Sequence, residues 1–272
     1  MKVVLFCGGL GMRLRDYSES VPKPMINIGY RPVLWHVMKY YAHYGHKDFV
    51  LCLGYKGDTI KNYFLSYNEC LSNDFILSNG GKEVQLLGSD IHDWKITFVD
   101  TGLTASIGER LKAVEKYVRG EEVFLANYSD GLTDAPLPKL LEHFTQRKKI
   151  ASFLCVQPTQ SFHLVSLDSD DTVSAVKHIT RAGVWINGGY FAFRSEIFKH
   201  LNEGEELVVD LFPRLIEKRE LIGYRYAGFW SCMDTLKDKQ QLDDMYSRDQ
   251  APWMVWISRK KVQEVRSHQE GK

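Results

Sequence analysis

Two cationic side chains near the N-terminus stand in a setting that suits phosphate chemistry. They lie in the stretch GGLGMRLRDYSESVPKPM, residues 8–25. Lys23 is placed between two prolines, whose rings fix φ and favour extended backbone before them. A lysine held in this way can point its ammonium group at a phosphate, and Arg13 adds a planar donor fork suited to a polyphosphate. We therefore predict that Arg13 and Lys23 bind a nucleotide and take part in catalysis.

The glycines of the same stretch follow directly on a short apolar run, VVLFC. Gly8, Gly9 and Gly11 allow close approach of the backbone to a ligand, and N–H groups exposed after a strand bind anions. The stretch does not match GxxxxGK[ST] and lacks the third glycine of GxGxxG. Taken alone it is also typical of a tight strand-to-helix turn, so the prediction of a nucleotide loop depends on Arg13 and Lys23.

Two aspartates are candidates for a metal site. Asp130 ends an apolar segment and is followed by glycine, and Asp234 lies at the end of GFWSCMDT. Two such carboxylates can hold one Mg²⁺, which takes few carboxylates and completes its shell with water and phosphate oxygens. The alternative for the Asp-Gly pair is a plain turn. Whether Asp130 and Asp234 meet in space is left open by the sequence.

The elements that must position these groups alternate along the first half of the chain. Short apolar runs are typical of buried strands, and apolar residues at helical spacing predict helices between them. We expect Asp58 to cap the second of these helices. The predicted strands are 2–7, 47–55, 95–102, 121–131 and 150–158, and the predicted helices are 32–45, 58–67, 108–120 and 137–149.

This alternation predicts an α/β fold with a Rossmann-like, mostly parallel sheet flanked by helices. Ligands of such sheets bind beyond the carboxyl ends of the strands, where the early glycines and Asp130 lie. The second half is richer in β-structure: a hairpin over 162–179, a strand over 184–193, a helix over 208–221 and a strand and turn over 221–235. Residues 66–95 are irregular and resemble an insertion used for assembly.

Composition limits the classes of protein to consider. The chain has 272 residues, 25% of them charged, with a formal net charge of +1, which argues against a nucleic-acid partner. Five scattered cysteines without metal-site spacing are typical of buried thiols in a reducing cytosol. No apolar run approaches the roughly 18 residues that span a bilayer, and no signal peptide is evident. We expect a cytoplasmic protein without a membrane partner.

The ordered motifs resemble those of bacterial glucose-1-phosphate cytidylyltransferases, a branch of the sugar-1-phosphate nucleotidyltransferases. The resemblance extends over about residues 1–256, and GFW-x-x-MDT with APW is typical of the cytidylyltransferase branch. The motifs that carry it are GGLGMRL, VPKPMINIG, RPVLWHVMKYY, GYKGDTIKNYF, ITFVDTG, YSDG, INGGYF, GFWSCMDTLKDK and APWMVW.

The resemblance implies in-line attack of a sugar-1-phosphate oxygen on the α-phosphorus of CTP or another NTP, with Mg²⁺ as cofactor and pyrophosphate as leaving group. It implies one domain, 1–256, with a nucleotide-binding half (1–150), a sugar-phosphate-binding half (151–256), the insertion 66–95 and a polar tail, 257–272. It also implies a homo-oligomer. The implied roles are catalysis for Arg13, Lys23 and Asp130, nucleotide binding for Gly8, Gly9, Gly11, Met12, Arg13 and Lys23, metal binding for Asp130 and Asp234, and sugar-phosphate binding for Tyr128, Asn187, Gly188 and Trp230.

The chain departs from the family's pattern at two positions and in one segment. Met12 replaces a threonine, and Ser129 replaces the glycine before the metal aspartate. The Glu-Lys-Pro segment before the sugar pocket is missing, and the corresponding stretch reads VKHITRAGVW. Lys177 or Arg181 could supply the cation that the lysine of that segment gives to the sugar phosphate.

These departures leave the acceptor and the activity open. The acceptor is glucose-1-phosphate by default, or a differently shaped phosphorylated sugar or polyol. The alternative to an active enzyme is a catalytically weak nucleotide-sugar-binding or regulatory homologue. Two other classes, a metal-dependent glycosyltransferase and an NAD oxidoreductase, fit the motifs less well.

Overall fold

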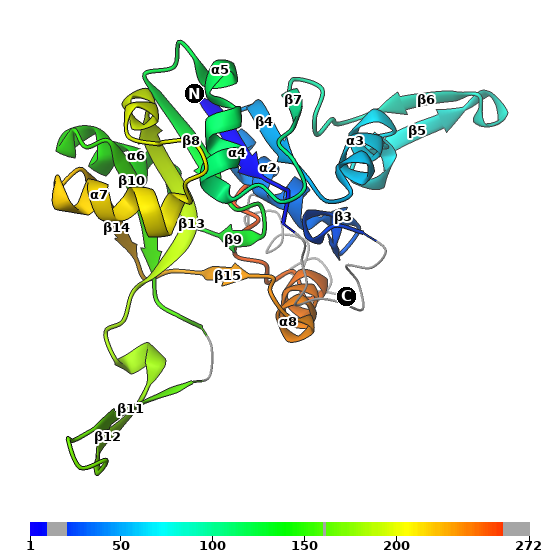
Figure 1. Cartoon of the computed structure of the whole chain (residues 1–272). Helices are drawn as coiled ribbons and strands as arrows, with labels where there is room; N and C mark the ends of the chain where they lie inside the picture. Colours follow the sequence, from blue (N-terminus) through cyan, green and yellow to red (C-terminus); the bar gives the residue numbers. More distant parts are fainter. Residues whose placement is uncertain (10–20, 160–161, 258–272) are drawn as a thin grey trace.

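A seven-stranded sheet forms the centre of the molecule (Figure 1). The computed structural model describes residues 1–9, 21–159 and 162–257. Six strands of the sheet run parallel, and β13 runs antiparallel to both of its neighbours, β8 and β10. The predicted mostly parallel α/β sheet is therefore confirmed. Its strands, in spatial order, are β14 (Leu221–Tyr226), β10 (Ala151–Val156), β13 (Ile186–Arg194), β8 (Val123–Asn127), β1 (Lys2–Phe6), β4 (Asp48–Leu53) and β7 (Lys95–Asp100).

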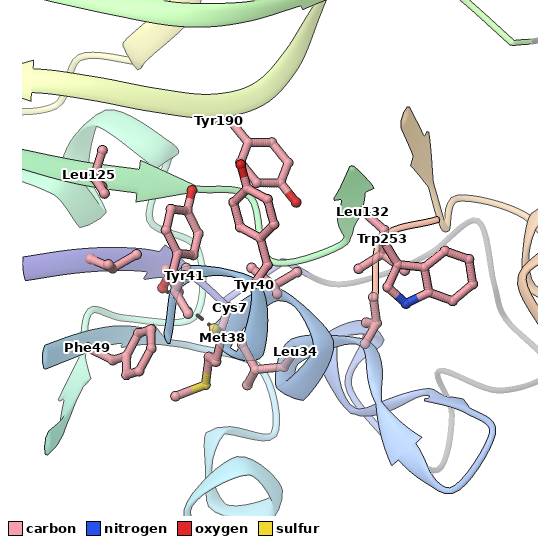
Figure 2. Close-up of a cluster of buried hydrophobic side chains, with 14 of the residues drawn as sticks. Cys7, Leu34, Met38, Tyr40, Tyr41, Phe49, Leu125, Leu132, Tyr190 and Trp253 are labelled. Atoms are coloured by element: carbon pink, nitrogen blue, oxygen red, sulfur yellow. Dashed lines mark hydrogen bonds between the residues drawn. The ribbon is translucent and has the colours of Figure 1, made fainter. Parts of the chain in front are cut away.

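Helices cover both faces of this sheet, which explains why its central strands are apolar at successive positions. On one face Leu5 and Leu51 belong to a core cluster, and on the other face Val4 and Val50 belong to a second. Figure 2 shows part of the first cluster, where the α2 side chains lie against strand residues and against Trp253. The helices are α2 (Val33–His43), α3 (Gly57–Leu65), α4 (Ile107–Ala113), α5 (Glu115–Val118), α6 (Leu137–Arg147), α7 (Phe212–Glu217) and α8 (Leu236–Ser247).

Some local expectations were wrong or incomplete. Helix α3 begins at Gly57 after Lys56 in the left-handed conformation, so Asp58 lies in the first turn and is not the cap. The helix predicted over 108–120 is divided at Val114 into α4 and α5. The predicted helix over 208–221 begins with a π-helical turn, Leu207–Leu211, before α7. Helix α8, which begins at a capping box between Thr235 and Asp238, was not predicted.

Two hairpins project from opposite sides of the molecule (Figure 1). One is β11 (His163–Leu167) with β12 (Val173–His178), as predicted for 162–179. The other, β5 (Phe75–Ser78) with β6 (Glu83–Leu86), lies within the segment expected to be irregular. Apolar side chains on both hairpins are exposed, among them Leu77 at 59% and Val176 at 59%.

Short strands and 3-10 turns complete the fold. None of the helices in the described ranges is both long and apolar enough to cross a membrane. The short strands are β2 (Asn27–Ile28), β3 (Arg31–Pro32), β9 (Gly131–Thr133) and β15 (Trp230–Cys232). The 3-10 turns are η2 (Lys23–Met25), η3 (Glu69–Leu71), η4 (Asn79–Gly81), η5 (Ile179–Arg181) and η6 (Ser195–Lys199).

Candidate active site

Lys23 lies between two carboxylates at the carboxyl ends of the strands. Its Nζ donates to Asp130 Oδ2 and to Asp234 Oδ1, each at 2.5 Å. Lys23 opens the short turn η2, with Pro22 in an extended conformation before it and Pro24 after it. The two prolines therefore hold the backbone of Lys23 as the sequence predicted, and the ammonium group is aimed at a pair of acids.

The two aspartates are brought together by a small antiparallel sheet. Strand β9 follows Asp130 and pairs with β15, which precedes Asp234, and Gly131 is opposite Cys232. The Met233 N–H also donates to the Asp130 carbonyl at 3.0 Å. Residues that lie far apart along the chain thus converge, a proximity that the sequence left open.

Opposing effects set the charges in this cluster. Burial by itself lowers the pKa of the Lys23 ammonium, but Asp130 and Asp234 together raise that pKa above its ordinary value. Burial raises the pKa of Asp130, and Lys23 opposes that shift without cancelling it. Lys23 is therefore cationic at neutral pH. The cluster holds one ammonium group between two acidic groups, an arrangement that can exchange partners with added cations or phosphates.

The turn that presents Asp130 is held in an unusual conformation by Ser129. Ser129 has φ of 67°, in the left-handed region that non-glycine residues rarely adopt. Its N–H donates to Asn127 Oδ1 at 2.8 Å, and its hydroxyl donates to the Phe6 carbonyl at 2.8 Å. The hydroxyl thereby links the turn after β8 to the end of β1, two residues before Gly8. This contact gives the Ser129 hydroxyl a structural role in the turn.

Replacement of Ser129 should give an unusual order of stabilities. Ser129→Ala keeps the left-handed strain and leaves the buried Phe6 carbonyl without its partner, so it should destabilise the protein by about 1–3 kcal/mol. Ser129→Gly loses the same bond but relieves about 1–2 kcal/mol of strain, so it should stay near wild type. Urea unfolding followed by circular dichroism measures both. A glycine variant no more stable than the alanine variant would show that the strain is not relieved.

A cavity of about 250 Å³ opens beside the Lys23 cluster. Asn187 Nδ2 donates to the Tyr128 hydroxyl at 3.4 Å, and Trp230 Nε1 donates to the Gly188 carbonyl at 2.8 Å. Gly189 has φ of 75°, and a Cβ there would lie 2.6 Å from the Tyr128 ring. The cavity is lined by Asn127, Tyr128, Asp130, Gly131, Asn187, Gly188, Gly189, Trp230, Cys232 and Asp234.

A buried arginine, which the sequence did not reveal as a site residue, packs against Gly8. Arg110, on α4, is 2% exposed, and a Cβ at Gly8 would lie 2.1 Å from its Nη1. Its guanidinium donates to the Gly8 carbonyl at 3.1 Å, to Leu53 O at 3.1 Å and to Thr101 Oγ1 at 2.6 Å. Burial lowers the pKa of Arg110. The carboxyl ends of β1, β4 and β7 therefore share one buried cation. The only hint in the sequence is an arginine on a helix that follows a predicted strand end.

The remaining predicted residues are placed as follows. Gly11, Met12 and Arg13 lie outside the described residues, and Gly9 is exposed at the end of the segment that precedes them. Lys177 is on β12 and Arg181 is in η5, and neither lines the cavity. Their roles in sugar-phosphate binding therefore stay predictions.

The donor set of the cluster fits Mg²⁺. Among the described residues no group of three His, Cys, Asp or Glu side chains is arranged to hold a metal. Asp130 and Asp234, however, both contact one nitrogen and can therefore both contact one small cation. Mg²⁺ accepts such a pair of carboxylates because water and phosphate oxygens complete its shell.

Comparison with known proteins gives a consistent result. The nucleotidyl transferase family model matches residues 2–238. A glucose-1-phosphate cytidylyltransferase of Salmonella typhi is 34% identical over 94% of this chain and 100% of its own length. A protein named probable glucose-1-phosphate cytidylyltransferase, from Bacillus subtilis strain 168, is 35% identical over 94% of this chain and 100% of its own.

Solved structures share the fold. A UTP-bound UGPase of Acinetobacter baumannii superposes with a TM-score of 0.67 at 16% identity, covering 91% of this chain and 93% of that one. HddC of Yersinia pseudotuberculosis in complex with GMP-PN gives a TM-score of 0.65 at 19% identity, covering 90% and 99%. At these identities the likeness concerns the fold alone.

Proposed function

The chain belongs to the nucleotidyl transferase family, and from this premise we propose that it transfers a cytidylyl group from CTP to a sugar-1-phosphate, with release of pyrophosphate. Glucose-1-phosphate is the default acceptor, by similarity to the cytidylyltransferases above. The observation that carries the proposal is the position of Lys23, 2.5 Å from Asp130 and from Asp234 beside a cavity at the carboxyl ends of the strands. This is where α/β sheets bind their ligands.

The chemistry proposed for this site is positioning and neutralisation of charge. Lys23 would bind the α-phosphate and stabilise the negative charge that builds there during in-line attack. To do so its ammonium must leave at least one of the two carboxylates. Asp130 and Asp234 would hold Mg²⁺, which supplies positive charge to the phosphates when bound. Arg13 would bind the β- and γ-phosphates.

The nucleotide and the acceptor would occupy neighbouring parts of the site. Gly8, Gly9 and Gly11 would bind base and phosphates through their backbone, and Met12 would lie beside them. Arg110 supports Gly8 from below, as its hydrogen bond to that carbonyl indicates. Tyr128, Asn187, Gly188 and Trp230 would line the sugar pocket, which agrees with their positions around the cavity.

We also propose a homo-oligomer in the cytoplasm. The hairpin β5–β6 supports the proposed oligomer, because Ile76 is 48% exposed and Leu77 is 59% exposed on a ribbon that projects from the body of the molecule. Two-stranded ribbons are marginally stable when isolated in water, so a second copy of the chain is a reasonable partner for it.

A substrate panel tests the proposed reaction. Pyrophosphate release is measured with Mg²⁺ for the common NTPs crossed with a set of sugar-1-phosphates. We expect release with CTP and one sugar-1-phosphate. Measurable CTP binding without release for every pair would contradict the proposal and favour the catalytically weak nucleotide-sugar-binding homologue.

A further inference from the structure

None of the described residues that line the cavity beside Lys23 carries a positive charge. A phosphate monoester carries about −1.5 to −2 charges at neutral pH. Among the described residues that line the cavity, the ionised side chains are Asp130 and Asp234, and the nearby Lys23 already bonds both of them. Placing a phosphate beside these two carboxylates costs free energy unless another positively charged group binds it.

Arg225 is a cation on the same face of the sheet. In the register of the strands, Cys155 of β10 lies between Asn187 of β13 and Arg225 of β14. Residues in register on neighbouring strands point to the same face, and strands lie about 4.8 Å apart. The three side chains therefore form one row at the carboxyl edge of the sheet. The row begins at Asn187, which lines the cavity, and ends at Arg225, which is exposed two strands away and does not itself line the cavity.

The exposed Arg225 guanidinium lies over an indole ring and has no acidic partner among the described residues. Its central carbon lies 5.6 Å from the centroid of the Trp185 ring, and Trp185 is two residues before Asn187. A guanidinium over the face of an indole is attracted by the ring, and its N–H donors can still bind an anion. Within the described ranges no carboxylate forms an ion pair with Arg225, whereas Arg194 and Arg214 pair with Glu122 and Glu205.

We propose that Arg225, held by Trp185, is the cation that binds the anionic group of the acceptor. The proposal rests on the proposed function and names the missing contact of that site. The anion is the 1-phosphate of the acceptor or a second acidic group on its sugar. Lys177 and Arg181, the cations expected from the sequence, belong to the hairpin β11–β12 and the turn after it, and that hairpin projects away from the sheet (Figure 1).

The test compares Arg225→Gln with a matched control, Arg147→Gln. Arg147 is exposed in the last turn of α6, directly before β10 begins, and so lies at the opposite edge of the sheet. Both changes remove one positive charge. KM and kcat are measured for CTP, for glucose-1-phosphate and for glucuronic acid-1-phosphate. Calorimetric binding of the two sugar phosphates to each variant gives a second readout that needs no turnover.

We expect Arg225→Gln to raise KM for the acceptor about 10- to 100-fold, the loss of one charge-assisted hydrogen bond. KM for CTP should not change, and Arg147→Gln should match wild type. A rise for both sugar phosphates identifies the 1-phosphate as the anion, and a rise for glucuronic acid-1-phosphate alone identifies a second acidic group. Arg225→Lys should recover only part of the loss, because a lysine keeps the charge without the planar, forked donors of a guanidinium.

Other outcomes would overturn the assignment. Unchanged acceptor KM and affinity in Arg225→Gln would do so, as would a rise confined to Lys177→Gln or Arg181→Gln. Equal losses for CTP and acceptor would indicate a structural role for Arg225. If wild type releases no pyrophosphate with any substrate pair, the proposed reaction fails, and the calorimetric comparison still decides whether Arg225 binds sugar phosphates.

Discussion

Lys23→Ala is expected to lower kcat by about 10²- to 10³-fold, the usual effect of losing one preorganised group at a developing charge. The same variant should need less Mg²⁺ for half-maximal activity. In the structure the Lys23 ammonium contacts both Asp130 and Asp234, so it competes with any other cation for those oxygens. Its removal leaves two carboxylates facing each other, which favours binding of a divalent ion. Initial rates over a Mg²⁺ titration measure both effects.

A lower kcat together with a lower Mg²⁺ requirement would distinguish a catalytic role of Lys23 from damage to the fold. A misfolded or loosened site would lose turnover and require more Mg²⁺, not less. Lys39→Ala is a suitable control, because Lys39 also pairs with a buried acid, Asp90, at 2.8 Å, but lies away from the cavity. Turnover near wild type in Lys23→Ala would refute the role proposed for Lys23.

Asp130→Asn is expected to reduce turnover by a similar factor, about 10²-fold or more, and to raise the Mg²⁺ requirement. The change removes one negative charge and one strong ligand while the shape of the side chain is kept. It also changes the pH profile. Burial raises the pKa of Asp130, so acidification should protonate this carboxyl earlier than an ordinary aspartate and weaken Mg²⁺ binding in wild type. In Asp130→Asn, the fall in activity at low pH that comes from protonation of Asp130 should therefore be absent.

Asp134→Asn provides the matched control for this variant. Asp134 Oδ1 accepts hydrogen bonds from the Tyr226 hydroxyl at 2.6 Å and from the Phe229 N–H at 2.8 Å, and an asparagine oxygen can keep both. Asp134 does not line the cavity. An Asp130→Asn enzyme with the Mg²⁺ requirement and acid limb of wild type would exclude Asp130 from the metal site.

The sequence predicted the central elements well because their signals are local. Continuous apolar runs such as that of β1 and the helical spacing of α2 do not depend on distant parts of the chain. The antiparallel direction of β13 could not be predicted, because pairing partners are set by the tertiary structure. The cap of α3 was wrong because Lys56 takes the left-handed conformation, and Gly57 rather than the following acid begins the helix.

The candidate site was predicted in part for the same reason. Lys23 between two prolines and Asp130 at a strand end are visible locally. The meeting of Asp130 with Asp234 depends on β9 and β15, strands of three residues each whose pairing leaves no periodic pattern to read. Arg110 and Arg225 were missed because the contacts that single them out are made with residues far away in the sequence, such as Gly8 for Arg110 and Trp185 for Arg225.

The late position of β15 in the chain has a consequence for folding during synthesis. Lys23 and Asp130 are 107 positions apart, whereas Lys23 and Asp234 are 211 positions apart. A nascent chain can therefore form the first contact well before the ribosome has made the second acid. The proposed metal site would stay incomplete until β15 and Asp234 have emerged and docked. Chains truncated before β15 should therefore lack the proposed metal site and show no turnover.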